Sequence, residues 1–332
     1  MSGKKKLISE LRQDFVSGEW AVIATGRGKR PHDFLKQKRE PFRQPKSGCP
    51  FEKLPAGVLA AYSLDEEWQV GVIPNKYPVF GRGVCSFFHR VGPYQWGEGV
   101  GFHEVVITRD HERSIGRMRI EEVELVIRAY QDRYLALRND DCVEYISIFH
   151  NHGKLSGATI SHPHSQIIAI PVIPPDVGRS LRGSADFFHE NKTCVHCHLL
   201  KYELKVRDRV IYENDFFAVL APFASKTAFE IRIYPKRHEP HFEMILAQER
   251  MVLADALRSA LAKLFRGLKN PDYNFFLHTA PIADSKEFHH YHWHFEILPK
   301  TAIWAGFEIG TGIEISTIAP EKAAEFLRRI KI

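Results

Sequence analysis

The chain is poor in cysteine, with five among its 332 residues, and it has no apolar run near the roughly 20 residues of a membrane-spanning helix. Charged residues follow its basic start at 4–6, where a signal peptide would have an apolar segment. An odd, small number of cysteines does not suit a disulfide framework, and Cys194-x-x-Cys197 has the spacing of metal ligands. We therefore expect a cytoplasmic protein whose cysteines bind metal rather than pair.

Neither sign of charge dominates. Lysine and arginine number 46 against 40 aspartates and glutamates, and the resulting net charge of +6 suits an anionic substrate. Basic residues gather only at 4–6 and between Arg27 and Arg43, which is too little to indicate a nucleic-acid surface. The apolar fraction of 44% and the charged fraction of 26% are typical of a globular protein, and the length predicts two domains or one large one.

The same order of strands and helices recurs in the two halves of the chain. In the first half, hydrophobic patterning predicts two strands, at 68–73 and 103–108, then a long helix at 120–137 and a third strand at 144–149. In the second half it predicts the same series, with strands at 216–220 and 229–234, a helix at 247–265 and a strand at 273–278. One further strand, 20–24, lies in an irregular basic segment at the N-terminus.

This recurrence predicts an internal duplication. We expect an α+β fold with two similar halves, residues 1–175 and 176–332, each an antiparallel sheet with a long helix. The weak link between the halves is expected at 171–191, where Pro174-Pro175 and Gly178 interrupt the pattern.

Cysteines and histidines of the second half form a set typical of a closed zinc site. Cys194 and Cys197 are followed by His238, at the end of a strand, and by His290, just before the next histidine-rich strand. Four such ligands leave no position for water, as in structural zinc sites. The alternative is two buried free cysteines beside two unrelated histidines.

A related set occurs in the first half, formed by Cys49, Glu52, His111 and His162. Its two histidines are 51 residues apart, against 52 in the second half. Glu52 stands where a second cysteine would be expected, and a carboxylate oxygen is an acceptable zinc ligand with more pH-sensitive binding. We expect a second, weaker metal site here. A metal-free hydrogen-bonded cluster is the alternative.

The segment 149–167 has the residues of a phosphate site. Gly153 and Gly157 allow close approach of a phosphate, and Asn151, Ser156 and Thr159 add polar side chains. A strand follows, His162-Pro-His164-Ser-Gln166, in which alternate side chains share one face.

Beside this loop, the His164 imidazole is placed to attack phosphorus, and the Gln166 amide is placed to donate to a nonbridging oxygen. The alternative is a histidine-rich strand whose polar groups are paired in the core. His292, in the similar strand His290-Tyr-His292-Trp-His294, is the rival nucleophile. The segment before it, 279–287, contains no glycine, which favours a structural or metal role, with His278 expected nearby.

In order and spacing, these motifs resemble the galactose-1-phosphate uridylyltransferase family of the histidine-triad superfamily. The likeness covers nearly the whole chain and centres on Asn151-x-Gly-x-x-x-Gly with His162-Pro-His164-x-Gln166. Further similar segments are Arg27-x-x-Arg30-Pro, Val72-Ile-Pro-Asn75-Lys-Tyr-Pro, Gly101-Phe-His-Glu-Val, His292-Trp-His294 and Gly306-Phe-Glu308-Ile-Gly-Thr-Gly.

The resemblance implies histidine-triad-like halves and a two-step nucleotidyl transfer. His164 would attack the α-phosphorus of a nucleotide sugar such as UDP-glucose, release a hexose 1-phosphate and pass UMP to a second hexose 1-phosphate. The implied contacts to the nucleotide are Asn75, Asn151, Gly157, Thr159 and Gln166, and those to the sugar phosphate are Arg27, Arg30 and Glu308. A homodimer with shared active sites is also implied.

Departures from the family pattern leave the acceptor open. Glu52 replaces a family cysteine. The second Cys2His2 set, with the segment 306–312, is more similar to the branch that includes ADP-glucose-type nucleotide-sugar phosphorylases, in which inorganic phosphate is the acceptor. The segment 300–306 is short and apolar, where uridylyltransferases have more cationic contacts. The motifs are also compatible with a histidine-triad nucleotide hydrolase, in which water is the acceptor, and with a non-enzymatic nucleotide-binding protein.

Overall fold

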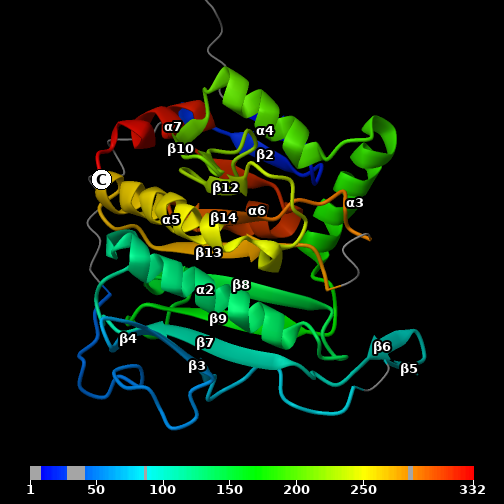
Figure 1. The fold of residues 1–332 in the computed structure, drawn as a ribbon. Helices are drawn as coiled ribbons and strands as arrows, with labels where there is room; N and C mark the ends of the chain where they lie inside the picture. Colours follow the sequence, from blue (N-terminus) through cyan, green and yellow to red (C-terminus); the bar gives the residue numbers. More distant parts are fainter. Residues whose placement is uncertain (1–8, 28–41, 86–87, 283–286) are drawn as a thin grey trace, which may run out of the picture.

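A single antiparallel sheet of ten strands forms the centre of the structure, a computed structural model that describes residues 9–27, 42–85, 88–282 and 287–332 (Figure 1). Across the sheet the strands follow the order β10 (Val210–Glu213), β11 (Phe217–Leu220), β12 (Ile231–Pro235), β14 (His294–Pro299), β13 (Tyr273–His278), β8 (Tyr145–His152), β9 (His164–Ile170), β7 (Phe102–Thr108), β4 (Glu67–Pro74) and β3 (Ala60–Leu64). The expected α+β fold with antiparallel pairing is confirmed.

The strand order repeats between the halves. From the middle of the sheet outward, the first half runs β8-β9-β7-β4-β3 and the second runs β13-β14-β12-β11-β10. The halves meet where β8 pairs with β13, with Asn151 opposite Asn274. This repeat confirms the expected duplication. The division at residue 175 stays a prediction, because both halves share the one sheet.

Two long helices, α2 (Ile120–Leu137) and α5 (Ala247–Gly267), lie side by side on one face of the sheet (Figure 1). α2 buries Val123, Ile127, Tyr130 and Tyr134, whose spacing of three to four residues puts them on one stripe. α5 repeats the pattern and contains many alanines, which allow close packing.

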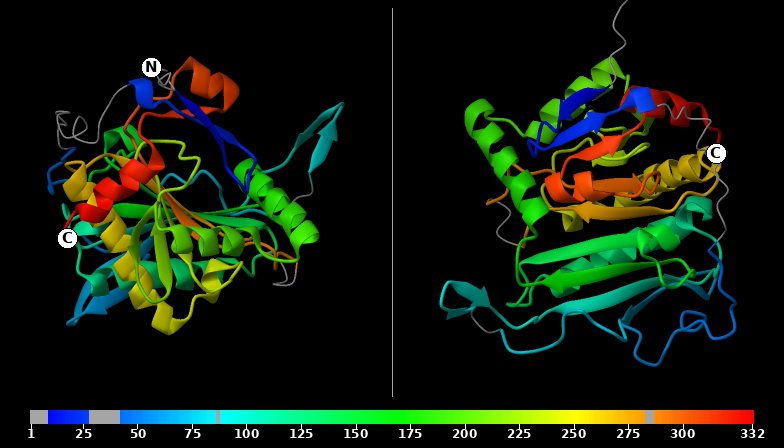
Figure 2. Two further views of the ribbon diagram at one scale, coloured as in Figure 1. Left: turned by 90° about the horizontal axis from the view of Figure 1, so that it is seen from above. Right: turned by 180° about the vertical axis from the view of Figure 1, so that it is seen from behind.

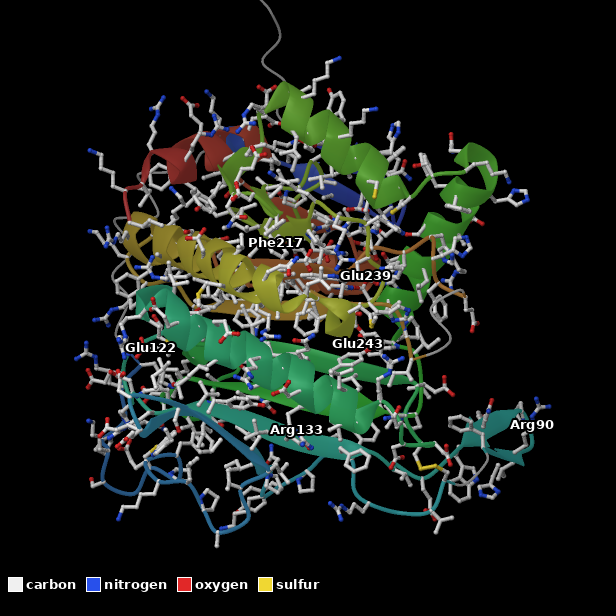
Figure 3. The ribbon with its side chains drawn as sticks, in the orientation of Figure 1. Arg90, Glu122, Arg133, Phe217, Glu239 and Glu243 are labelled. Carbon is white, nitrogen blue, oxygen red and sulfur yellow. A yellow bond between two sulfur atoms is a disulfide. The ribbon has the colours of Figure 1, made fainter. Side chains whose placement is uncertain are left out.

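α2 also fixes the strands beneath it by polar contacts. The Tyr130 hydroxyl lies 2.5 Å from Oγ of Ser165 on β9. Arg133, labelled in Figure 3, donates two hydrogen bonds of 2.7 and 2.8 Å to the Glu104 carboxylate on β7. Because successive strand residues point to opposite faces, this contact to Ser165 leaves its neighbours His164 and Gln166 on the other face.

The other face is covered over the second half. There a small sheet of β1 (Glu10–Gln13), β2 (Trp20–Ile23) and β15 (Glu314–Ser316) lies with the helices α3 (Pro175–Asn191) and α4 (Val195–Val206) (Figure 2). The remaining helices are α6 (Gly306–Thr311) and α7 (Pro320–Arg329).

A hairpin of β5 (His89–Val91) and β6 (Tyr94–Trp96) projects from the body of the molecule (Figure 2), and Arg90 is labelled on it in Figure 3. It lies in the long connection between β4 and β7. Among the described residues, no helix has the length and apolar content needed to cross a bilayer.

The segment 171–191, which we expect to link the halves, contains the helix α3, since Pro175 occupies the first helical turn, where a missing N–H is tolerated. Its role as the boundary stays a prediction. One expectation for the cysteines was wrong. The cysteines do not all lie in metal sets, because Cys85 and Cys142 form a disulfide with a Cα–Cα distance of 5.3 Å. The first cysteine precedes the projecting hairpin and the second follows α2, so their proximity depends on the fold.

Candidate active site and metal-binding groups

His164 is the first residue of β9, on the face opposite to α2. Its Nδ1 lies 2.8 Å from the carbonyl oxygen of His162. A carbonyl can only accept, so Nδ1 has the proton and Nε2 has the lone pair. Nε2 has no hydrogen-bond partner among the residues that the structure describes. Burial lowers the pKa of His164, so the ring is neutral near pH 7.

Gln166 lies two residues further along the same face. Its Oε1 is 2.8 Å from Nε2 of His103 on β7, and the Asn75 amide nitrogen is 3.0 Å from the same ring atom. The structure thus brings Asn75 and Gln166 together through His103. Sequence reasoning gave His103 no role, although it lies within the Gly101-Phe-His-Glu-Val segment and shares the β7 face of Val105.

The loop between β8 and β9 has the backbone conformations of a close turn. Gly153 has φ +85° and ψ 163°, and Gly157 has φ +89° and ψ 10°. The Asp272 carboxylate accepts a hydrogen bond of 2.6 Å from the Leu155 N–H within the loop. Beside the loop, Asn274 donates to Oδ1 of Asn151 at 2.7 Å. The loop is therefore fixed from the second half of the chain.

Gly157 and Thr159 are exposed, and the Thr159 carbonyl accepts a hydrogen bond of 3.1 Å from the Gln44 amide. Within the turn, the N–H groups of Ser156 and Ala158 donate to the Gly153 carbonyl, and that of Gly157 donates to the Lys154 carbonyl.

The first-half metal set is assembled as expected. Ligand atoms of Cys49, Glu52, His111 and His162 all lie within 4.8 Å of one another. Nδ1 of His162 is 3.5 Å from the Cys49 sulfur and 3.3 Å from Oε1 of Glu52, which also contacts Nδ1 of His111. Glu52 thus occupies the position of a fourth ligand.

The second-half set is assembled with one change. It consists of Cys194, Cys197, His238 and His292, and His290 does not belong to it. Nδ1 of His238 and Nδ1 of His292 each lie 3.4 Å from the Cys197 sulfur. The expectation of His290 as a ligand was wrong, because the loop before β14 is longer than the matched spacing assumed.

All four histidines of the two sets have the same orientation. Each Nε2 faces a backbone carbonyl, at 2.5 Å for His162, 2.8 Å for His111 and His238, and 2.9 Å for His292. The proton is therefore on Nε2, and the Nδ1 lone pair points into each set. Carbonyl partners of this kind orient histidine ligands in metal sites. Both groups can hold a metal ion, and cysteine with imidazole suits zinc.

The second half contains a buried counterpart of the His164 site. His294 repeats the contact of His164, with Nδ1 3.1 Å from the carbonyl of His292. His292 therefore corresponds to His162, and His294 rather than His292 corresponds to His164. Glu296 takes the place of Gln166 and binds Arg232 at 2.9 Å.

This counterpart has no space for a substrate. His294 is 2% exposed and stacks on His278 with ring centroids 5.1 Å apart. The cavity beside them is about 20 Å³. Asp14, from the β1–β2 turn, lies 2.9 Å from Arg232 and closes the site. Burial alone would raise the pKa of Glu296, but the Arg232 guanidinium lowers it well below its usual range.

Of the three expected sugar-phosphate residues, only Glu308 has a side chain that the structure describes. Arg30 lies outside the described residues, and of Arg27 only the backbone, in a 3-10 turn at Thr25–Arg27, is described. Glu308 lies on α6, where its carboxylate accepts a hydrogen bond of 3.0 Å from the Ala305 N–H.

Known proteins share this architecture. A family model described as "Domain of unknown function (DUF4921)" matches residues 100–330. The ADP-glucose phosphorylase of Arabidopsis thaliana is 34% identical over 97% of this chain and 93% of its own length. The galactose-1-phosphate uridylyltransferase of Thermotoga maritima is 29% identical over 97% and 99%. The solved structure of an ADP-glucose phosphorylase from Arabidopsis thaliana with bound ADP-glucose has a TM-score of 0.81 at 31% identity and covers 98% of this chain and 100% of that chain.

A duplicated antiparallel sheet with a His-Pro-His strand beside a glycine loop defines the class of histidine-triad-type nucleotidyltransferase folds. The chain belongs to the galactose-1-phosphate uridylyltransferase-like family that the DUF4921 description covers, which confirms the resemblance seen in the sequence.

The identity of the fourth ligand gives a first prediction. His292→Ala should lose the metal of the second group and several kcal/mol of folding stability, because binding energy at a structural site stabilises the fold. His290→Ala should retain the metal, since His290 lies outside the group. Elemental analysis of the two purified variants, with Cys197→Ser as a second test of the group, measures this. Loss of metal from His290→Ala alone would contradict the assignment.

The loop glycines give a second prediction. At Gly157 a Cβ meets no atom within 4 Å. Gly157→Ala should therefore lower the free energy of unfolding only by the strain of the left-handed conformation, about 1–2 kcal/mol. At Gly153 a Cβ would lie 2.3 Å from the Asp272 carboxylate, in a backbone region that is nearly restricted to glycine. Gly153→Ala should therefore cost more. Urea unfolding of both, with the unstrained Gly57→Ala as control, checks the order.

Proposed function

We propose that this protein transfers a nucleoside monophosphate, UMP in the first instance, from a nucleotide sugar to a hexose 1-phosphate through a covalent nucleotidyl-His164 intermediate. The observation that supports it most is the hydrogen bond from Nδ1–H of His164 to the His162 carbonyl. It leaves the Nε2 lone pair on a neutral, partly exposed imidazole, in the strand that follows the glycine loop.

The chemistry balances without an external base. The Nε2 lone pair forms a bond to the α-phosphorus, the bond from phosphorus to the bridging oxygen breaks, and its electron pair leaves with the hexose 1-phosphate. The ring then bears a positive charge, which the His162 carbonyl stabilises through the Nδ1–H bond. In the second step an acceptor phosphate oxygen attacks the same phosphorus, and neutral His164 is released.

The surrounding polar groups have separate roles in this proposal. The Gln166 amide donates to a nonbridging oxygen at the α-phosphorus, where negative charge develops. The loop from Asn151 through Gly157 to Thr159 binds the phosphates, and Asn75 binds the nucleoside side.

The acceptor has a second candidate. An ADP-glucose phosphorylase, in which inorganic phosphate attacks an adenylyl-His164, is favoured by the 34% identity to the Arabidopsis thaliana enzyme, against 29% for the Thermotoga maritima uridylyltransferase. Both candidates share the first step at His164 and differ in base and acceptor.

The metals are proposed to be structural zinc ions. The Cys2His2 group leaves no ligand position for substrate, so it would hold the turn at Cys194 against β14. The group with Glu52 contains His162, whose carbonyl orients His164, so a weaker ion there would steady the nucleophile.

We further propose a cytoplasmic homodimer in which Arg27, Arg30 and Glu308 contact the sugar phosphate of the partner's site. The segment around Glu308 exposes large apolar side chains, with Ile303 82% and Ile309 73% exposed. Exposed apolar groups in one segment are typical of a protein interface.

The nucleophile is tested by intact mass. Wild-type protein incubated separately with UDP-glucose and ADP-glucose should gain a nucleotidyl adduct, and His164→Ala should gain none. Gln166→Ala should form the adduct about 10²–10³-fold more slowly, as when one donor to a developing oxyanion is lost. His152→Gln is the control, because the His152 side chain lies on the sheet face opposite to that of His164 and Gln166, where it binds Asn270. An adduct on His164→Ala would place the nucleophile elsewhere.

Reaction of the isolated adduct with each candidate acceptor then identifies the acceptor. Galactose 1-phosphate should convert a uridylyl adduct to UDP-galactose if the first candidate is correct. Inorganic phosphate should release ADP from an adenylyl adduct if the second is correct. Turnover of the nucleotide sugar by water with no adduct would instead identify a hydrolase.

Shared sites are tested by mixing two inactive variants. His164→Ala and Glu308→Ala dimers should each be inactive, since each lacks one part of every site. After subunit exchange, mixed dimers have one intact site each, so about a quarter of wild-type activity should return. No recovery despite confirmed exchange would place Glu308 in its own subunit's site.

A further inference from the structure

His103 lies where three parts of the candidate site meet. It is on β7, and the residue is 8% exposed. The Val79 N–H donates to Nδ1 at 3.2 Å, and Nε2 lies 2.8 Å from Oε1 of Gln166. The Asn75 N–H also donates to the His103 carbonyl at 2.8 Å. The ring thus contacts both the segment after β4 and the amide beside His164.

These contacts determine the protonation of the ring. A backbone N–H can only donate, so Nδ1 must have the lone pair, and the doubly protonated ring is excluded. Nε2 of the neutral ring therefore has the proton and donates to an oxygen, which is Oε1 of Gln166. The Asn75 amide is oriented independently, because its Oδ1 accepts the Tyr77 N–H at 2.9 Å.

The orientation of Gln166 follows from this bond. With Oε1 held by His103, the NH2 group of the planar amide points away from His103. Gln166 shares its strand face with His164, two residues earlier, so the NH2 group is available to a phosphate oxygen bound there. Without a donor at His103, the amide could rotate by half a turn and present its oxygen to the phosphate, where it would repel the anion.

The Asn75 amide has a related consequence. Its Nδ2 lies beside a ring N–H, which cannot accept, so its hydrogens find no acceptor on His103. Among the described residues, the Asn75 NH2 group has no other hydrogen-bond partner. It remains available to a bound nucleotide.

We propose that His103 is a positioning residue. It sets the direction of the Gln166 amide toward the reacting phosphate, and through Val79 it holds the segment after β4 that contains Asn75. This deepens the proposed function and rests on it for the kinetic effect. The structural part stands by itself, because the tautomer is a property of the resting protein.

The tautomer is measured directly. Long-range ¹⁵N–¹H correlation spectra of histidine-labelled protein, with the His103 signals assigned by their loss in His103→Gln, should show protonated Nε2 and unprotonated Nδ1. A proton on Nδ1 would overturn the proposal whether or not the protein transfers nucleotides.

Single-turnover adduct formation tests the role. With the nucleotide sugar that labels wild type, His103→Leu should slow adduct formation about 10–100-fold at saturating substrate, as for other groups that orient a reacting side chain. His103→Gln, whose amide can donate to Oε1, should restore most of the rate. His103→Glu is of the same size but can only accept, so it should reverse the Gln166 amide and lose at least as much as His103→Leu.

A double variant separates positioning from a structural role. In the Gln166→Ala background, His103→Leu should slow the reaction by less than about 3-fold, because residues that act through one contact are not additive. An undiminished loss there, equal rates for the Gln and Glu variants, or wild-type rates for His103→Leu would each overturn the proposal. If wild-type protein forms no adduct, the proposed function fails, and the tautomer still decides the placement of Gln166.

Discussion

A neutral imidazole has one proton for two nitrogens, and this constraint organises the whole site. Wherever a backbone carbonyl faces one ring nitrogen, the other is left with its lone pair. In the two metal groups the carbonyl faces Nε2, so Nδ1 points at the cysteine or carboxylate. At His164 the carbonyl faces Nδ1 instead, so the lone pair is on Nε2, the atom that we propose as the nucleophile. The backbone thus gives opposite orientations to two histidines that are two residues apart.

The duplication supplies a scaffold in which one site is open and the other is closed. His164 and His294 have the same hydrogen bond to the preceding histidine's carbonyl. They differ in their neighbours, because Gln166 is replaced by Glu296, and the facing position on the adjacent strand, Val105, is replaced by Arg232. An amide can donate to a phosphate oxygen, whereas the carboxylate is bound by Arg232 and would repel it.

The second half, whose own site is closed, still contributes to the open site of the first half. Asn274 and Asp272, at the start of β13 and just before it, bind Asn151 and the glycine loop across the central strand pair. Removing the second half would leave these loop contacts unmade, as well as an unpaired edge at β8. The buried ion pairs of Arg232 with Glu296 and Asp14 also fix the small β1–β2 sheet on the second half.

The sequence by itself determined the elements and most of the chemistry. Helix 120–137 and strand 273–278 have the predicted bounds, because their side-chain periodicity is local and strong. The types of metal ligand, the glycine loop and the position of His164 likewise follow from residue type and short spacing. Only the tertiary structure decided between His290 and His292, joined Cys85 to Cys142, and brought His103 between Asn75 and Gln166. Each of these depends on distances between strands and loops far apart in the chain, and local pattern does not encode such distances.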